Sequence, residues 1–240
     1  MNNKRIPYLG SLEEGIILIN KPKGWKSFDV VRFLRALLKN LTGKPIKVGH
    51  AGTLDPLAEG LLVLASGTYT KRLYQYLGED KSYITTITLG ESTPSHDRET
   101  PVNKTLPLPN LDKQILFSTL EQFKGKLSQR PPDFSAVKIK GKRAYSLARE
   151  GKLLDLESKM VEIKKIELLK VDLPRMTFQV TCSKGTYIRS LVRDIGDSLQ
   201  CGAVMEHLLR THCGPLSLND AVTPVELKKY FSNVAIEFRD

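Results

Sequence analysis

Two short apolar runs, Gly15–Ile19 and Gly60–Ala65, constrain the fold of this chain more than any other feature of its sequence. Short apolar runs bounded by glycine, proline or asparagine are typical of buried strands. Along the rest of the chain, strand-like and helix-like patterns mix irregularly, without the regular rhythm of βαβ units. The pattern therefore favours an α+β fold with a substantial antiparallel sheet.

Alternating residues predict further strands, and apolar residues at helical spacing predict the helices. The predicted strands lie at 81–89, 136–140, 160–171 and 176–182. The predicted helices lie at 27–38, 70–77, 111–123, 186–199, 203–210 and 224–230. Ser27 is expected to cap the first helix and Ile115 to face inward on the third, whereas residues 90–110 are polar and form a loop.

The charge of the chain restricts its partners. Its 240 residues include 37 Lys and Arg against 26 Asp and Glu, a formal net charge of +11. This surplus favours a polyanion, either nucleic acid or an anionic membrane surface. The first residues lack the pattern of a signal peptide, and no apolar run is long enough to span a bilayer. The three scattered cysteines suit a reducing compartment, so a cytoplasmic protein without membrane attachment is expected.

Metals and nucleotide cofactors are not expected. The four histidines and three cysteines show neither CxxC nor HExxH spacing. The glycines form neither GxGxxG nor GxxxxGK followed by Ser or Thr, which are the common nucleotide-binding loops.

The stretch GHAGTLDPLAEG, residues 49–60, presents a single aspartate between glycines and a proline. Pro56 disfavours the helical region at Asp55, and the glycines permit close approach of the backbone to a ligand. Asp-Pro is also ordinary turn chemistry, so the motif alone leaves a structural role open. A lone carboxylate can instead act as a nucleophile toward the anomeric carbon of a sugar, provided that a nearby cation keeps it ionised.

Candidate partners of this carboxylate lie elsewhere in the chain. Arg189, at the start of a predicted helix, could supply the cation, or it could be a surface arginine of an amphipathic helix. Tyr83 and Tyr187 could stack on a base or pack in a half-buried position.

Residues 125–151 are poor in apolar residues and rich in cations. Lys138, Lys140 and Lys142 recur at period two and would project from one side of a strand. The segment is therefore expected to leave the core and contact a polyanion, unless it is a basic surface hairpin without a ligand.

Several motifs, taken in order, give the chain a specific resemblance. They are Asn20-Lys21-Pro22-Lys23-Gly24, GHAGTLDPLAEGLL from Gly49, Lys81-Ser82-Tyr83, PPDFSAVK from Pro131, Gly141-Lys142-Arg143-Ala144-Tyr145, CSKGTYIR from Cys182, Cys201-Gly202-Ala203 and Leu208-Leu209-Arg210. Together they resemble the tRNA pseudouridine synthase B (TruB) family from about residue 15 to residue 215. The GHxGTLDPxAxG motif is shared with RNA-guided synthases, whereas the PPxxSAxK block is typical of the stand-alone bacterial tRNA enzymes.

The resemblance implies a pseudouridine-synthase fold, an α+β fold with a mixed, mainly antiparallel central sheet flanked by helices. It also implies an isomerase that converts the T-loop uridine at tRNA position 55 to pseudouridine. Asp55 would be the nucleophile toward a flipped nucleotide, so that the glycosidic bond breaks and the uracil rejoins through carbon. Three other implied site residues act on the aspartate or the RNA: Arg189 pairs with the aspartate, Tyr83 stacks on the base and helps proton removal, and His50 helps to open the T-loop. Tyr187 and Leu208 would line the uracil pocket, and Lys21 would support the fold around the site. The expected partner is the T-arm stem-loop of tRNA, bound by a monomer without metal or cofactor.

The resemblance also implies a domain plan. A catalytic domain is expected at 10–215, with an RNA-binding insertion at 125–151. The expected backbone contacts of the insertion are Lys138, Lys140, Lys142 and Arg143. Residues 216–240 are expected to form a short helical tail rather than the full PUA-like domain that bacterial members commonly carry.

Two other functions stay open from the sequence. One is a tRNA-binding or folding chaperone that opens and re-closes RNA without catalysis. The other is a nucleoside hydrolase or glycosidase that uses Asp55, with Glu59 as a second carboxylate. Release of free uracil would favour the hydrolase, since a synthase releases nothing.

Overall fold

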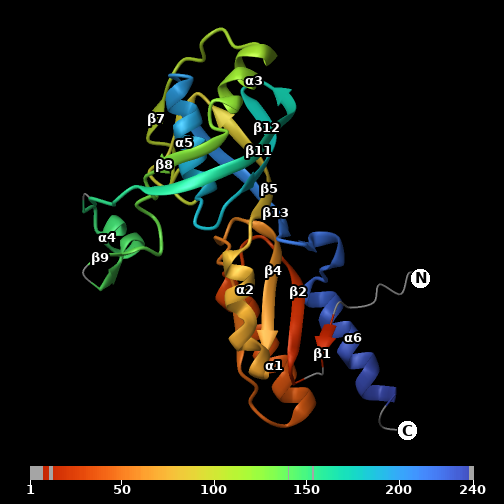
Figure 1. Cartoon of the computed structure of the whole chain (residues 1–240). Helices are drawn as coiled ribbons and strands as arrows, with labels where there is room; N and C mark the ends of the chain where they lie inside the picture. The colour runs from red at the N-terminus through yellow and green to blue at the C-terminus, as the bar shows by residue number, and fades with distance from the viewer. Residues whose placement is uncertain (1–7, 11–12, 140, 153, 238–240) are drawn as a thin grey trace. The chain divides into compact units, whose positions relative to one another are not determined.

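The computed structural model describes residues 8–10, 13–139, 141–152 and 154–237. The chain divides into two compact units, of which the first comprises Met1–Ser82 and Leu209–Asp240 and the second Tyr83–Leu208. Two strands continue from one unit into the other (Figure 1): β5 (Lys81–Leu89) enters the second unit, and β13 (Ala203–Cys213) returns to the first.

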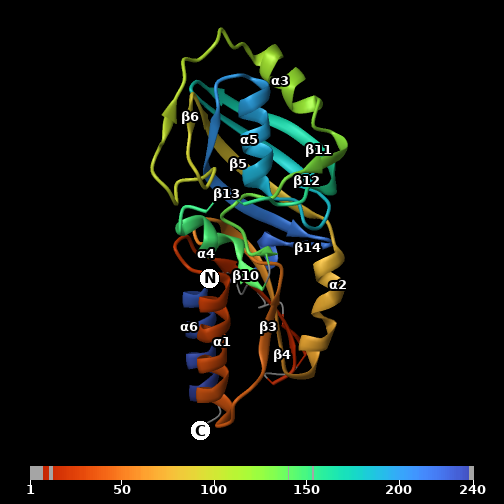
Figure 2. The same ribbon diagram turned by 90° about the vertical axis from the view of Figure 1, so that its left-hand side faces the viewer.

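The second unit is a sheet with strand order β13-β5-β12-β11-β8. Helices α3 and α5 lie over one face of it (Figure 2). The elements that belong wholly to this unit are β6 (Glu91–Ser92), β7 (Lys104–Thr105), α3 (Lys113–Glu121), β8 (Gly125–Gln129), β9 (Lys138–Ile139), β10 (Lys142–Arg143), α4 (Ala144–Arg149), β11 (Lys159–Asp172), β12 (Arg175–Cys182) and α5 (Ile188–Ser198). The pairs β11–β12 and β11–β8 are antiparallel, and the predicted α+β class is confirmed.

Two predictions in this unit are wrong. The helix predicted at 203–210 is strand β13, because this segment lies beside β5 within the sheet and its pairing overrides the helical propensity of its Ala, Met, Glu and Leu residues. Ile115 is 42% exposed rather than inward, because α3 turns Leu116 and Leu120 toward the core. The polar segment 90–110 is a loop as predicted, apart from the short β6–β7 pair.

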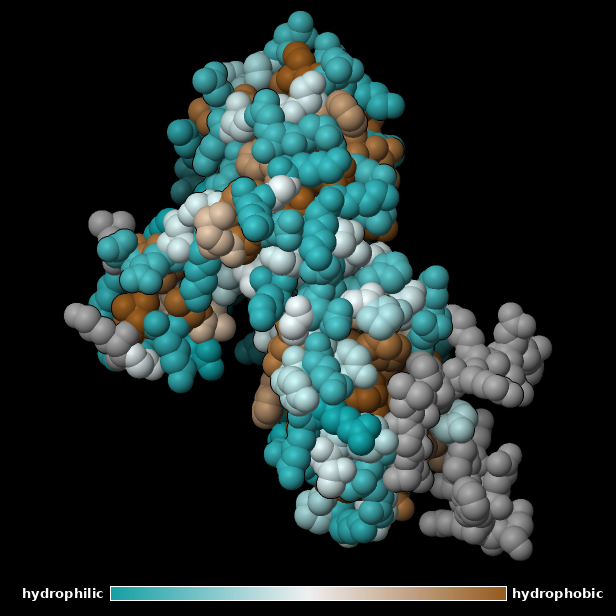
Figure 3. Space-filling view, in the orientation of Figure 1, coloured by the Kyte–Doolittle hydropathy of each residue, from teal (hydrophilic) through white to brown (hydrophobic). Residues whose placement is uncertain are grey.

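The surface is mainly hydrophilic on the face drawn in Figure 3, where hydrophobic residues form separate patches. In the part of the chain that the structure describes, no helix has the length and apolar character needed to cross a membrane.

The first unit is a sheet with strand order β1-β2-β4-β13, in which β3 also pairs with β4 and β14 with β13. Its other elements are β1 (Tyr8–Gly10), β2 (Gly15–Lys21), α1 (Ser27–Thr42), β3 (Val48–Ala51), β4 (Glu59–Ser66), the 3₁₀ helix η1 (Gly67–Arg72), α2 (Leu73–Gly78), β14 (Leu216–Ser217), the 3₁₀ helix η2 (Leu218–Asp220) and α6 (Pro224–Glu237). The two apolar runs of the sequence are therefore the neighbouring strands β2 and β4, as predicted.

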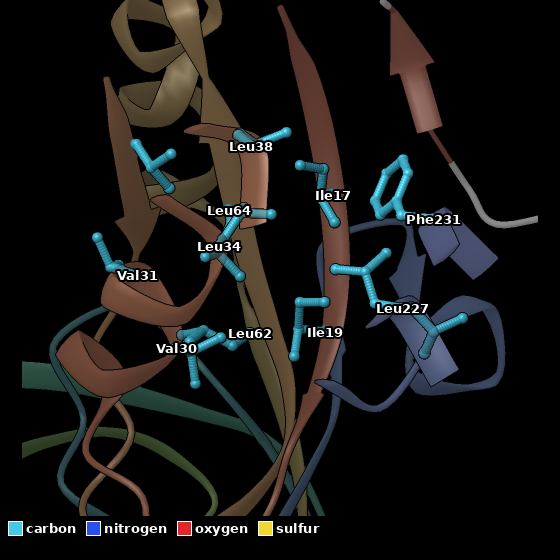
Figure 4. Packing of buried hydrophobic residues seen from close by; sticks show 12 residues of the cluster. Ile17, Ile19, Val30, Val31, Leu34, Leu38, Leu62, Leu64, Leu227 and Phe231 are labelled. Carbon is cyan, nitrogen blue, oxygen red and sulfur yellow. The ribbon is translucent and has the colours of Figure 1, made fainter. Parts of the chain in front are cut away.

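Strands β2 and β4 are buried on both faces. Ile17 pairs with Leu64 and packs with Leu34 of α1 and Phe231 of α6 in one apolar cluster (Figure 4). The alternate residues, such as Leu18, belong to a second apolar cluster that includes Leu73 of α2. Because both faces are covered, this pair of strands is closely packed and restrains the segments that leave its ends.

Candidate functional site

Asp55 lies in the turn that joins the antiparallel strands β3 and β4, which we call the Asp55 turn (residues 52–58). Gly52 opens the turn with a φ of +84°, in the left-handed region that favours glycine. The carbonyl of Asp55 accepts a hydrogen bond from Ala58 N at 3.1 Å, which closes the turn. The Asp55 residue is half-buried.

Both neighbours of Asp55 are fixed to the segment that joins β2 to α1. The Ser27 hydroxyl donates to Leu54 O at 2.9 Å and accepts from Leu54 N at 2.8 Å. On the other side, Pro56 O accepts from Gly24 N at 2.8 Å. Ser27 is thus the first residue of α1 and bonds to the turn rather than capping the helix, which corrects the sequence prediction.

Lys21, the last residue of β2, is fully buried beneath this turn. Its Nζ donates to Trp25 O at 2.6 Å, to Pro22 O at 3.0 Å and to Pro56 O at 3.4 Å. Burial lowers the pKa of Lys21 to about 8, and the carboxylates of Glu59 and Asp55 oppose that effect. The ammonium therefore stays mainly charged at neutral pH and links the β2–α1 turn to the Asp55 turn.

His50 and Arg210 complete the polar surroundings of the turn. His50 lies in β3, and burial, followed by the positive charge of Arg210, lowers the pKa of its imidazole. Arg210, in β13, is only 1% exposed and donates from Nε to Leu61 O at 2.7 Å. The sequence marked Arg210 only as part of the Leu208-Leu209-Arg210 motif and gave it no role.

In the second unit, Arg189 lies in the first turn of α5 and is buried, not on a solvent-facing surface. Its Nε lies 3.6 Å from Asp97 Oδ2, and the two side chains are 4% and 2% exposed. Its two terminal nitrogens donate to Ser95 O at 3.2 Å and Phe134 O at 2.9 Å. We call this group the Arg189 cluster.

Sequence reasoning missed Asp97, which lies in the polar loop at 90–110. In the sequence, only the acidic residue type of Asp97 could have suggested a role, because its pairing with Arg189, far along the chain, is created by the fold. His96, beside it, has a φ of +61°. Burial, followed by the positive charges of Arg193, Arg189 and Arg130, lowers the pKa of His96 to about 4.

The other predicted pocket residues also lie in the second unit. Tyr83 of β5 and Leu208 of β13 are 9% and 6% exposed and lie in neighbouring strands. Tyr187 precedes α5, and its backbone N donates to Gln129 Oε1 at 2.8 Å. These residues are thus held in regular structure or by hydrogen bonds.

The cationic segment forms the two-stranded β9–β10 hairpin, in which Lys138 pairs with Arg143 and Lys142 with Ile139. Lys138 and Lys142 therefore lie on two different strands, and the prediction that they project from one side of a single strand is wrong. Lys138, Lys142 and Arg143 are all exposed. Arg143 donates to Ala136 O at 2.7 Å. Lys140 lies outside the described residues.

The structure thus groups the predicted residues within each unit. Lys21, His50 and Asp55 belong to the first unit. Arg189, Tyr83, Tyr187, Leu208 and the hairpin cations belong to the second. Over the described residues, no three His, Cys, Asp or Glu side chains are grouped so that they could hold a metal ion.

Comparisons with known proteins agree on one family. Residues 39–188 match the model of the TruB family pseudouridylate synthase N-terminal domain, and residues 189–236 match that of the tRNA pseudouridylate synthase B C-terminal domain. The tRNA pseudouridine synthase B of Bacteroides fragilis is 42% identical over 96% of this chain and 100% of its own length. That of Parabacteroides distasonis is 43% identical over 94% of this chain and 96% of its own length.

A solved structure shares the fold. A chain of a Cbf5-Nop10-Gar1 complex is 28% identical, with a TM-score of 0.71. The match covers 92% of the present chain but only 55% of that one, so the present chain spans about half the length of this structural relative.

Proposed function

We propose, on the premise that the chain belongs to the TruB family and is a tRNA pseudouridine synthase B, that Asp55 is the nucleophile of this isomerase. The proposed reaction converts the T-loop uridine at tRNA position 55 to pseudouridine. This family membership favours catalysis over the chaperone that the sequence left open. The observation that carries the assignment is the anchoring of the Asp55 turn, in which both neighbours of the aspartate are held by hydrogen bonds. Such anchoring keeps a reacting group in one geometry, which is where much of an enzyme's rate advantage arises.

The proposed reaction begins with attack of the Asp55 carboxylate on the ribose or the base of the target uridine. The C–N glycosidic bond then breaks, and the uracil turns within the site. A C–C bond forms between C5 and C1′, the bond to Asp55 breaks, and the proton on C5 leaves while N1 regains one. The product is an isomer of the substrate, so no redox equivalent or co-substrate is consumed.

Other residues have supporting parts in this proposal. The Arg189 guanidinium would neutralise the carboxylate, and its bonds within the Arg189 cluster favour a fixed orientation for that role. Tyr83 would stack on the base and help to remove the C5 proton. Tyr187 and Leu208 would line the uracil pocket, and His50 would help to open the T-loop.

The substrate must unstack before it can react. Flipping a nucleotide out of a structured loop costs on the order of a few kcal/mol. Phosphate contacts at the exposed β9–β10 hairpin would offset this cost, since cations that displace condensed counterions supply most sequence-independent affinity for RNA. We therefore propose the T-arm stem-loop as the bound portion of tRNA.

Asp55→Asn tests the proposal. With unmodified tRNA labelled with tritium at C5 of uridine, we expect tritium release to fall at least about a thousandfold, because the amide cannot act as the nucleophile. Binding of tRNA should change by less than about threefold, since the substitution leaves the turn and the hairpin in place.

Glu59→Gln is the matched control, because it removes the neighbouring carboxylate at the start of β4. It should retain the modification, and mapping of the product should show the change at position 55. Retained tritium release by Asp55→Asn would reject the nucleophile. Free uracil among the products of the unmutated protein would indicate a hydrolase.

A further inference from the structure

We propose that Arg210 is a positioning residue, whose guanidinium holds the chain on both sides of Asp55 and so sets where the Asp55 carboxylate lies. The inference rests on the proposed role of Asp55 as nucleophile. It concerns a side chain that sequence reasoning left without a role.

The contacts of Arg210 reach the chain on both sides of Asp55. Its Nη2 donates to Gly52 O at 3.2 Å, just before the turn reaches Asp55. Its Nε donates to Leu61 O at 2.7 Å, just after the turn has entered β4. One rigid, planar group therefore fixes the distance between the two strands from which the turn emerges.

The burial of this cation needs a reason. Arg210 is 1% exposed, and taking a charged group out of water is unfavourable unless its N–H groups are satisfied. An apolar side chain of similar volume would fill the space without that penalty, but it could not bond to the carbonyls of Gly52 and Leu61. The buried guanidinium thus fixes the carbonyls of Gly52 and Leu61, although burying its charge is unfavourable.

The backbone around Arg210 is fitted to the same contact. Arg210 pairs with Gly60 in the parallel β13–β4 ladder. A Cβ at Gly60 would lie 2.4 Å from Arg210 O and 2.8 Å from Arg210 N, and Gly60 has a φ of +102°. Glycine at this position lets β13 approach closely enough for the guanidinium to reach both carbonyls.

Arg210→Lys tests the inference, because lysine keeps the charge but presents one nitrogen in place of a fork. We expect the single-turnover rate of pseudouridine formation at saturating enzyme to fall between about ten- and a hundredfold, as a small misplacement of a reacting group does. Binding of tRNA should stay within about twofold, and the protein should still melt cooperatively.

Arg35→Lys is the matched control. Arg35 also donates to a carbonyl of β3, that of Val48 at 2.8 Å, but at the end of the strand away from the Asp55 turn. The single-turnover rate of the Arg35→Lys variant should stay within about twofold of that of the unmutated protein. If Arg210→Lys does not melt cooperatively, Arg210→Gln, which keeps an N–H donor without the charge, replaces it.

Three outcomes overturn the inference: an unchanged rate in the Arg210 variant, a rate loss matched by equal losses in binding and melting temperature, or failure of both variants to fold. Asp55→Asn measured alongside separates the two proposals. An active Asp55→Asn enzyme rejects the nucleophile itself, whereas an inactive one beside a fully active Arg210 variant rejects only the positioning role.

Discussion

Two groups of basic residues in the second unit differ in setting, although Arg189 bonds to a carbonyl that lies shortly before the other group in the sequence. Arg189 is 4% exposed, pairs with Asp97 and donates to the carbonyl of Phe134. The β9–β10 hairpin begins a few residues after Phe134, and its cations Lys138 and Lys142 are exposed. The same kind of charge is thus enclosed in one place and solvated in the other.

The difference decides what each group can do. Removing one partner of a buried ion pair leaves an uncompensated charge and costs about 3–5 kcal/mol, whereas exposed pairs are worth about 0–1 kcal/mol. The bonds of the Arg189 cluster are therefore expected to contribute strongly to stability and to hold the Arg189 guanidinium in one orientation. The hairpin cations contribute little to folding and are available for a polyanion.

The largest effect is expected from Asp97→Asn. The substitution keeps an oxygen that can accept from Glu99 N, as Asp97 Oδ1 does at 2.9 Å, but it removes the charge opposite Arg189. We expect the free energy of unfolding to fall by about 3 kcal/mol in urea titrations. Asp133→Asn is the control, because Asp133 pairs with Arg130 at 2.8 Å with 35% of its side chain exposed. Equal losses in the two variants would remove the distinction between buried and exposed charge.

The next effect concerns His96, which lies among the same arginines. Its pKa of about 4 in the folded protein lies below the ordinary 6.5, so the unfolded chain binds more protons between these values. Stability from this group is present above about pH 6.5 and is lost as the pH falls toward 4. The loss amounts to about 3 kcal/mol.

His96→Asn should remove this dependence, and asparagine tolerates the φ of +61° at this position. Urea unfolding at about pH 7, 5.5 and 4 should show a steeper loss for the unmutated protein than for the variant. His212→Asn, at an exposed position, is the control. Parallel curves for His96→Asn and the unmutated protein would show that His96 is not held neutral by its surroundings.

The sequence predicted the fold well where local pattern and tertiary role agree. The alternation of Met176, Phe178 and Val180 predicts β12, and all three are buried. The helix predicted from Ala203 was wrong, because the residues of this segment favour a helix in isolation. Its place in the sheet is decided by pairing with strands far along the chain. Periodicity reports which face is buried, but it does not report which neighbour buries it.

The candidate site was predictable to a similar extent. Asp55 could be selected because a proline and glycines surround it in the sequence. Asp97 and Arg210 could not be assigned a role, because their contacts join segments that are distant in sequence and depend on burial. Ser27 was assigned to the helix start, where a local rule applies, although its hydroxyl bonds to Leu54.

The smallest effect, and the one that sharpens the comparison from the exposed side, is expected from Lys138→Gln with Lys142→Gln. Stability should change by less than about 0.5 kcal/mol, since both side chains are solvated. Binding of tRNA should weaken about tenfold at low salt, and the slope of log K against log salt should become shallower by about 1.5, because two phosphate contacts are lost. Lys165→Gln with Lys170→Gln, two exposed cations of β11, carries the same change in net charge and should leave the slope nearly unchanged. If both pairs lowered the slope equally, the binding would follow total charge, and the hairpin would have no special part in holding the RNA.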